Sequence, residues 1–232
     1  FNEAGYGSVK TTYADARLKD KRCTFNYVQE WFSKNVGNDK QPGGTNSFVA
    51  QAASDEYQID LFFINDLEDQ KFKIGMVCIY IFFKFAAVVP IKSKETGDVA
   101  AGIIESIQKM GRKPKMIYTD DEAALSTTAL KTYFEEQKIK HYITRKHAAF
   151  AERFIRTFKG VLYKRIDSTG NPKKKKPETD TDPQWTDYVY QVMLTYNNKS
   201  VHSSTKKVPV DAMKDTHQVD VKSNLEIRAM KN

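Results

Sequence analysis

The chain has 232 residues, of which 40% are hydrophobic and 12% aromatic, and it carries 37 Lys and Arg against 29 Asp and Glu. This length and composition exclude a disordered chain and are typical of one large domain, or of a domain with a small appendage. The net charge of +8 favours a polyanionic partner, with a basic protein that has no such partner as the plain alternative.

Cysteine and histidine content argues against a disulfide framework and against structural zinc. Cys23 and Cys78 lie far apart in the sequence, and none of the four histidines falls near a cysteine at zinc-finger spacing. Two isolated cysteines are typical of a reducing compartment. The longest apolar run, "MVCIYIFF", is too short to span a bilayer. We therefore expect a buried strand there and no membrane partner.

The first 54 residues predict a small helical unit followed by a linker. Residues 1–35 contain "SVKTTYADARL" and "CTFNYVQEWF", in which apolar residues recur at helical spacing and Thr24 is a candidate cap for the second helix. Residues 36–54 are rich in Gly, Asn and Ser, which indicates a linker.

Residues 55–215 predict an α/β domain. Five strands are expected in "YQIDLFFI", "FKIGMVCIYIFF", "FAAVVPI", "PKMIYTD" and "IKHYIT". Helices are expected over residues 95–110, over "STTALKTYFEEQ" with Ser126 or Thr127 as its cap, in "HAAFAERFIRTFK" and in "WTDYVYQVMLTYN". Three strands, a helix, a strand, a helix, a strand and a helix predict a mixed central sheet. Residues 216–232 are interpreted as a C-terminal extension.

Three carboxylates are candidates for metal binding. Asp60 interrupts an apolar strand, Asp120 ends another, and Glu152 lies on the polar side of a later helix. An α/β sheet can bring these elements to one edge, where clustered carboxylates repel each other unless cations join them. Oxygen ligands suit Mg²⁺ or Mn²⁺, and two such ions can promote phosphoryl transfer.

Each carboxylate also has an ordinary interpretation. Glu152 and Arg156 are spaced for an i,i+4 ion pair on a helix, and Asp120 could cap the following turn. Asp60 is the hardest to explain in this way, because apolar residues flank it on both sides.

Basic residues gather around the third carboxylate. Residues 145–176 contain 11 Lys and Arg but two acids, Glu152 and Asp167. This local bias predicts contacts with a phosphate backbone. The run Lys173–Lys176 within the polar loop 167–184 is interpreted as a solvated loop, with a nuclear address or a DNA contact as alternatives.

Several segments, taken in order, resemble the catalytic core of retroviral-type (DDE) integrases, and most of all the integrases of Polinton (Maverick) transposons and virophages. These segments are "YQIDL", "FAAVVPIKSK", "MIYTD", "HYIT", "AERFIRTFK" and "YNNKSVHSSTKKVPVDAM". The resemblance runs from about Gly7 to the C-terminus. It implies an RNase H-like fold, with a mixed five-stranded sheet flanked by helices, plus the small helical N-terminal segment.

The resemblance also implies an activity and its residues. Asp60, Asp120 and Glu152 match the catalytic, metal-binding acids, which implies two Mg²⁺ or Mn²⁺ ions, 3′-end processing of a mobile DNA element and strand transfer into target DNA. Arg156 and Lys159 match basic positions that contact the element's DNA end, and "TRKHAAF" matches the active-site loop. The candidate DNA-binding residues are Arg145, Lys146, His147, Arg153, Arg156 and Lys159.

The implied partners are double-stranded DNA, as element ends and as target, and further copies of the chain in a homodimer or tetramer. The implied location is the nucleus of a eukaryotic host or a virus-like particle.

The chain departs from the family pattern after the second acid. The segment "TDDEAAL" has Glu122 where a glycine is expected, and 31 residues separate Asp120 from Glu152, fewer than the family usually has. Asp121 or Glu122 could therefore replace Asp120 as the second ligand. A catalytically degenerate or domesticated integrase that binds DNA or a protein is the alternative function, and an RNase H-like nuclease acting on RNA–DNA hybrids is a third.

Overall fold

A computed structural model describes residues 9–35, 53, 56–144, 148–169 and 183–230. The chain divides into two compact units, one within residues 1–47 and one within residues 48–231. The linker predicted over residues 36–54 lies outside the described residues except at Ala53, as do Arg145, Lys146, His147 and the lysine run 173–176.

The N-terminal unit is a pair of helices. Helix α1 spans Val9–Lys19 and α2 spans Phe25–Asn35. The hydroxyl of Thr24 accepts a hydrogen bond from the Tyr27 amide at 3.3 Å, so the predicted cap is confirmed. The rings of Tyr13 and Phe25 meet edge to face at 5.4 Å between centroids, which ties the two helices together.

The second unit is built on the predicted mixed sheet of five strands. Its strands are β1 (Glu56–Phe63), β2 (Ile74–Tyr80), β3 (Ala86–Ile91), β4 (Met116–Thr119) and β5 (Lys140–Ile143). They lie in the order β3-β2-β1-β4-β5, with antiparallel pairing on the β2 side of β1 and parallel pairing on the β4 side. The centre of this sheet, β1, carries the first candidate carboxylate.

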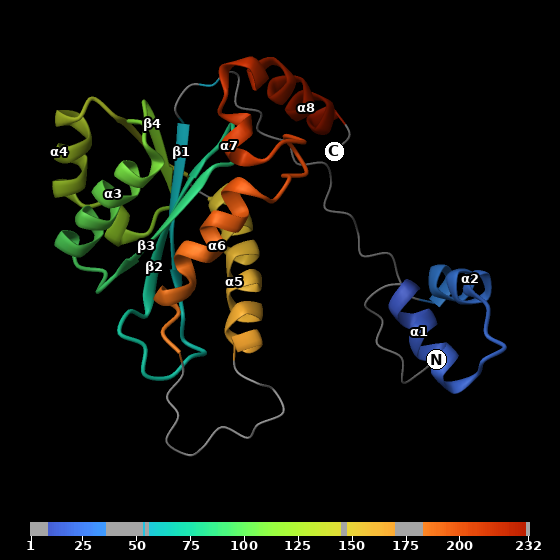
Figure 1. Cartoon of the computed structure of the whole chain (residues 1–232). Coiled ribbons are helices and arrows are strands. Elements are labelled where there is room, and N and C mark those ends of the chain that lie inside the picture. Colours follow the sequence, from blue (N-terminus) through green and yellow to red (C-terminus); the bar gives the residue numbers. More distant parts are fainter. Residues whose placement is uncertain (1–8, 36–52, 54–55, 145–147, 170–182, 231–232) are drawn as a thin grey trace. The chain divides into compact units, whose positions relative to one another are not determined.

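Helices cover both faces of the sheet (Figure 1). Helices α3 (Thr96–Met110) and α4 (Thr128–Glu136) lie on one face, and α5 (Ala149–Thr169) and α6 (Thr186–Asn198) lie on the other. Side chains alternate along β1, because Ile59 and Leu61 join the apolar cluster with α3 and α4, whereas Phe62 joins the cluster with α5 and α6. None of the described helices is long and apolar enough to cross a membrane.

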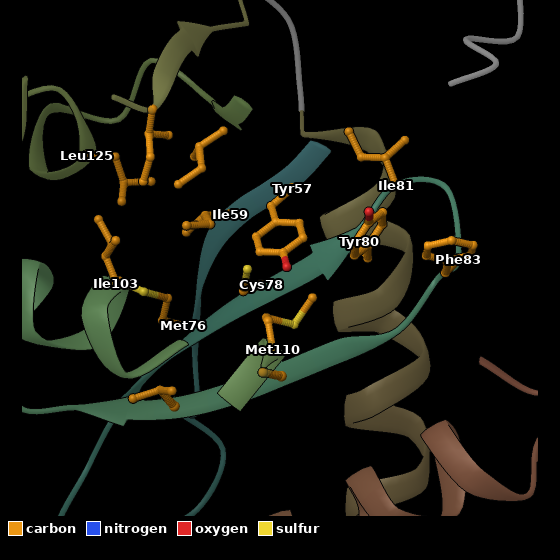
Figure 2. Close-up of a cluster of buried hydrophobic side chains, with 14 of the residues drawn as sticks. Tyr57, Ile59, Met76, Cys78, Tyr80, Ile81, Phe83, Ile103, Met110 and Leu125 are labelled. Atoms are coloured by element: carbon orange, nitrogen blue, oxygen red, sulfur yellow. The ribbon is translucent and has the colours of Figure 1, made fainter. Parts of the chain in front are cut away.

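The core on the α3 side is dense and contains the second cysteine. Figure 2 shows Tyr57 and Tyr80 facing each other from β1 and β2, with Cys78 and Met110 close by. The two tyrosine rings meet at 5.0 Å in an edge-to-face arrangement. Gly111, at φ 71°, ends α3 in the left-handed conformation that glycine adopts without strain.

The strand predicted from "FKIGMVCIYIFF" is shorter than expected. Strand β2 ends at Tyr80, and residues 81–83 form a buried turn before β3. Lys84 takes a positive φ of 64° there, and the Tyr80 amide donates to the Phe85 carbonyl at 2.7 Å. Apolar character extended beyond the strand because this turn is itself part of the core.

The C-terminal residues contain helices that the sequence analysis did not predict. Helix α7 spans Pro209–Ala212, near the end of the predicted α/β domain, and α8 spans Gln218–Met230, within the segment interpreted as an extension. Val221 and Leu225 of α8 lie in the same apolar cluster as β1 and β2. Helix α8 is therefore packed as part of the second unit. Two short 3-10 turns, Ala123–Leu125 and Asp215–His217, connect neighbouring elements.

Candidate active site

Asp60 is a buried carboxylate on the sheet face that α5 and α6 cover. Its cross-strand neighbour Val77 belongs to the apolar cluster on that face, and Asp60 itself is 7% exposed. One carboxylate oxygen accepts a hydrogen bond from the Leu61 amide at 2.8 Å. One such bond leaves most of the acceptor capacity of an ionised carboxylate unused.

Asp120 reaches the same place from the parallel neighbour of β1. Gln58 is in register with Tyr118, and continuing that register by two residues places Asp120 alongside Asp60. Adjacent strands lie about 4.8 Å apart, and residues in register point to the same face. Asp120 follows the last residue of β4, and its side chain accepts a hydrogen bond from the Glu122 amide at 3.2 Å. The chain thus turns away immediately after the second carboxylate.

Glu152 lies in the first turn of α5, and a side chain from β1 holds that turn. The amide oxygen of Gln58 accepts hydrogen bonds from the backbone N–H groups of Phe150 and Ala151, at 2.7 and 2.9 Å. These N–H groups have no partner within the helix, so Gln58 acts as an N-cap supplied by the sheet. Gln58 therefore connects the strand that carries Asp60 to the helix turn that carries Glu152.

The pKa of Asp60 indicates which other acids lie near enough to affect it. The pKa of Asp60 is raised to about 7, mainly by burial and then by Asp120, while Glu152 and Glu122 add smaller contributions of the same sign. The bond from the Leu61 amide opposes this shift. A buried carboxyl group with a raised pKa, close to other acids, is a candidate site for a cation.

The three acids of "TDDE" have different surroundings. Asp121 is exposed, whereas Glu122 forms an ion pair with Lys94. The ammonium group of Lys94 also lies 4.6 Å from the centre of the Phe63 ring, at the end of β1. Glu122 thus already has a cationic partner, and Asp120 is the acid that follows directly from the strand beside Asp60.

Oxygen ligands of this kind fit a divalent cation by their chemistry. Asp60, Asp120 and Glu152 offer only carboxylate oxygens, which suit Mg²⁺ or Mn²⁺ rather than zinc. Among the residues that the structure describes, however, no three Asp, Glu, His or Cys side chains form a ready-made metal-binding group.

The candidate DNA-binding residues of α5 fall into two groups. Arg153 and Arg156 are exposed. Lys159 instead donates a hydrogen bond from its ammonium group to the Phe63 carbonyl at 2.6 Å. Lys159 therefore holds the end of β1 against α5, a role that its place on the polar side of the predicted helix did not indicate.

Gln58 was missed by the sequence analysis, and its role is testable. Changing Gln58 to Met keeps the side-chain volume but leaves two N–H groups at the start of α5 without an acceptor. We expect a loss of about 1–3 kcal/mol in the free energy of unfolding, and about tenfold weaker Mn²⁺ binding because Glu152 is less well placed. Urea unfolding and metal titration would measure the two effects.

Gln70 provides a matched control for this change. Its amide oxygen accepts from the Trp185 amide at 2.9 Å, at the start of α6, which carries no candidate ligand. Gln70→Met should lower stability by a similar amount without changing Mn²⁺ binding. Equal losses of metal affinity in the two variants would show that Gln58 acts through general stability alone.

Comparisons with known proteins give the fold and a distant sequence relationship. No family model matches the chain. The retrovirus-related Pol polyprotein from transposon 297 of Drosophila melanogaster is 26% identical over 149 residues, which cover 63% of this chain and 13% of that polyprotein. The match thus spans a small part of that polyprotein's length.

Solved structures match 69% to 86% of this chain. A chain of the simian T-cell lymphotropic virus intasome, determined in complex with the PP2A regulatory subunit B56γ, gives a TM-score of 0.60 at 15% identity and covers 86% of this chain and 69% of its own. The HTLV-2 integrase catalytic core domain in complex with magnesium gives a TM-score of 0.54 at 17% identity, covering 69% and 96%. The chain therefore has the RNase H-like fold of retroviral integrase catalytic cores and is related to a retrovirus-related Pol polyprotein.

Proposed function

We propose that this chain carries the catalytic core of an integrase that cuts and joins DNA with the help of divalent cations. The observation that carries the proposal is the buried carboxylate of Asp60, with Asp120 and Glu152 as electrostatic neighbours, in the centre of an integrase-type sheet. A buried acid among acids destabilises a fold unless a cation joins it.

Each residue has a role in this proposal. Asp60, Asp120 and Glu152 would hold two Mg²⁺ or Mn²⁺ ions, which when bound supply Lewis-acid chemistry for phosphoryl transfer. Asp60 must lose its proton before it can act as a ligand, and Gln58 keeps the first turn of α5 beside it. Exposed Arg153 and Arg156 would bind the DNA backbone, which fixes the scissile phosphate near the acids.

The reaction sequence, the partners and the location belong to the same proposal. Water is the nucleophile in 3′-end processing, and a DNA 3′-hydroxyl is the nucleophile in strand transfer. Because both ends of an element must join one target, the active form is a homodimer or tetramer on double-stranded DNA. The proposed source is a Polinton-type or virophage element. The proposed location is the nucleus or a virus-like particle.

A strand-transfer assay on short duplexes with the element's terminal sequence tests this proposal. Glu152→Gln should reduce Mg²⁺-dependent joining by about 10³-fold or more, because it removes one ligand and leaves the backbone in place. Glu135→Gln, which removes an exposed carboxylate from α4, is the matched control and should keep full activity. Joining that persists in Glu152→Gln would defeat the catalytic assignment.

A DNA-binding module without catalytic activity is a second candidate function. It is favoured by the lack of a ready-made metal group among the described residues and by the Lys94–Glu122 ion pair near the acids. Calorimetric titration with Mn²⁺ separates the two functions. An active site should bind Mn²⁺ in the wild type and lose it in Asp120→Asn, whereas a decayed site should bind DNA equally well with EDTA and show no Mn²⁺ uptake.

A further inference from the structure

Four basic side chains from four separate parts of the second unit lie close enough to affect one another electrostatically. Lys84 comes from the turn between β2 and β3, Arg153 from α5, His202 from the loop after α6, and Arg228 from α8. We call Lys84, Arg153, His202 and Arg228 the basic cluster. Arg153 directly follows Glu152 in the first turns of α5, so the cluster begins one residue from the candidate active site.

Lys84 forms the floor of the basic cluster. Its side chain is 4% exposed, and its ammonium group donates a hydrogen bond to the Ile81 carbonyl at 2.5 Å. The same group lies 3.9 Å from the centre of the Phe150 ring, just before Glu152 on α5. The Lys84 carbonyl accepts a hydrogen bond from the Tyr196 hydroxyl at 3.0 Å. The ammonium group is thus fixed in place from several directions.

Keeping a lysine at this position has two costs. A buried ammonium group without a carboxylate partner is expensive to desolvate. A positive φ of 64° adds strain that glycine would avoid. If this side chain served only to hold the turn in place, a neutral residue could fill the same volume without these costs. These costs point to a use for the positive charge.

His202 and Arg228 are both held by the loop that follows α6. The ring nitrogen Nδ1 of His202 lies 2.9 Å from the Ser204 hydroxyl, and the Arg228 guanidinium donates to the Ser203 hydroxyl at 2.8 Å. These bonds hold both side chains beside the same loop. Arg228 is half-buried and Arg153 is exposed, so both guanidinium groups reach solvent, whereas Lys84 is buried.

The positive charges of this cluster disfavour one another, and no described acid forms an ion pair with its members. Burial, and to a smaller extent Arg153 and Arg228, lower the pKa of Lys84 to about 7. Burial, together with Lys84, Arg228 and Arg153, lowers the pKa of His202 to about 4. Among the described residues, no carboxylate pairs with any member of the basic cluster. The surplus positive charge is therefore available to an anion from outside.

We propose that the basic cluster binds a backbone phosphate of DNA, with Arg153 and Arg228 as its forked donors. This inference rests on the proposed function, because the cluster begins one residue from Glu152 and DNA at the acids would pass close to it. Guanidinium groups match the geometry of phosphate oxygens, and the buried Lys84 adds attraction that water screens poorly.

DNA binding in EDTA tests the site without any catalysis. The probe is a fluorescent 20-base-pair duplex, and its affinity is measured by anisotropy across a range of salt concentrations. Arg228→Gln should weaken binding about tenfold at low salt and lower the salt slope by about 1. Lys222→Gln removes the same charge from an exposed position of α8 and is the matched control, which should change affinity less than twofold.

Lys84→Met removes the buried charge and keeps the apolar stem. It should weaken duplex binding as Arg228→Gln does, because the buried charge that attracts the phosphate is gone. If Lys84→Met fails to fold, Arg153→Gln and Arg228→Gln still decide the matter, since both side chains reach the surface. The proposal is overturned if Arg153→Gln and Arg228→Gln bind the duplex with the same affinity and salt slope as Lys222→Gln.

The ring of His202 gives a readout that a merely structural role would not move. A phosphate in the basic cluster offsets its neighbouring cations, so duplex DNA should raise the His202 pKa by about one unit or more in an NMR titration. A rise with inorganic sulfate but none with the duplex would overturn the DNA assignment. These outcomes are independent of strand transfer, so Glu152→Gln can fail its own test while the phosphate site stands.

Discussion

Replacing Asp60 by asparagine is expected to abolish metal-dependent DNA joining and, at the same time, to stabilise the fold above pH 7. The two effects have opposite signs because the Asp60 carboxylate would bind the ion but destabilises the fold when no ion is bound. Joining should fall by about 10³-fold or more, as for loss of a residue that acts within a catalytic unit. Strand transfer and urea unfolding of the same preparations would measure both effects.

The pH dependence of stability follows from the direction of the shift. The pKa of Asp60 is raised in the folded protein to about 7, above its ordinary value of 3.8. The folded protein therefore holds this proton more tightly than the unfolded chain, and stability falls as pH rises from about 4 to about 7. Asp60→Asn should match the wild type at pH 4 and exceed it by about 1–2 kcal/mol at pH 8 without metal, a figure reduced for solvent screening.

Divalent cations should reverse this difference. Millimolar Mg²⁺ at pH 8 should stabilise the wild type by mass action and leave Asp60→Asn unchanged. Glu135→Gln, as an exposed control on α4, should follow the wild type at every pH and respond to Mg²⁺ in the same way. If Asp60→Asn is less stable than the wild type at pH 8 in EDTA, the ionised Asp60 carboxylate does not destabilise the fold, and this assignment is contradicted.

Trp185→Ala is expected to have the largest effect on folding. The indole is fully buried at the start of α6, and it meets the Phe62 ring edge to face at 5.6 Å. Its N–H donates to the Phe72 carbonyl at 2.6 Å. Truncation of such a side chain costs about 3–5 kcal/mol, which is a large part of the total stability of a typical domain.

Two further variants separate packing from the hydrogen bond. Trp185→Phe keeps an aromatic ring but leaves the Phe72 carbonyl without its donor, so we expect a loss of about 1–3 kcal/mol plus a smaller packing term. Tyr190→Ala changes an aromatic residue of the same helix that is 74% exposed and should cost less than about 0.5 kcal/mol. A Trp185→Ala protein within 1 kcal/mol of the wild type by urea unfolding would refute this picture of the core.

The five strands and their mixed sheet were predictable because buried elements leave apolar runs in the local sequence. Runs such as "YQIDLFFI" are apolar enough to mark strands, and an acid within one of them is conspicuous because its desolvation is costly. Asp60 could be chosen for that reason. The turn at residues 81–83 could not be distinguished from strand, since it is as apolar and as buried as β2 itself.

The supporting residues could not be predicted because their partners are distant in sequence. Gln58 accepts hydrogen bonds from Phe150 and Ala151, which follow it by 92 and 93 positions in the sequence. A single glutamine in a strand gives no sequence pattern that predicts such distant partners. Lys159 had the spacing of a residue on the polar side of the helix, yet its ammonium group donates a hydrogen bond to the carbonyl at the end of β1. For α8, the i,i+4 spacing of Val221 and Leu225 was a usable signal, weakened by the polar residues around it.

The two cysteines give each compact unit its own chemical reporter. Cys23 lies in the N-terminal unit and is partly exposed, whereas Cys78 lies wholly inside the second unit, where burial raises the pKa of its thiol above the ordinary range. A thiol reagent should therefore modify Cys23 at once and Cys78 only when the sheet opens. The slow rate would then measure how often the second unit unfolds, in the natural sequence and without any introduced label.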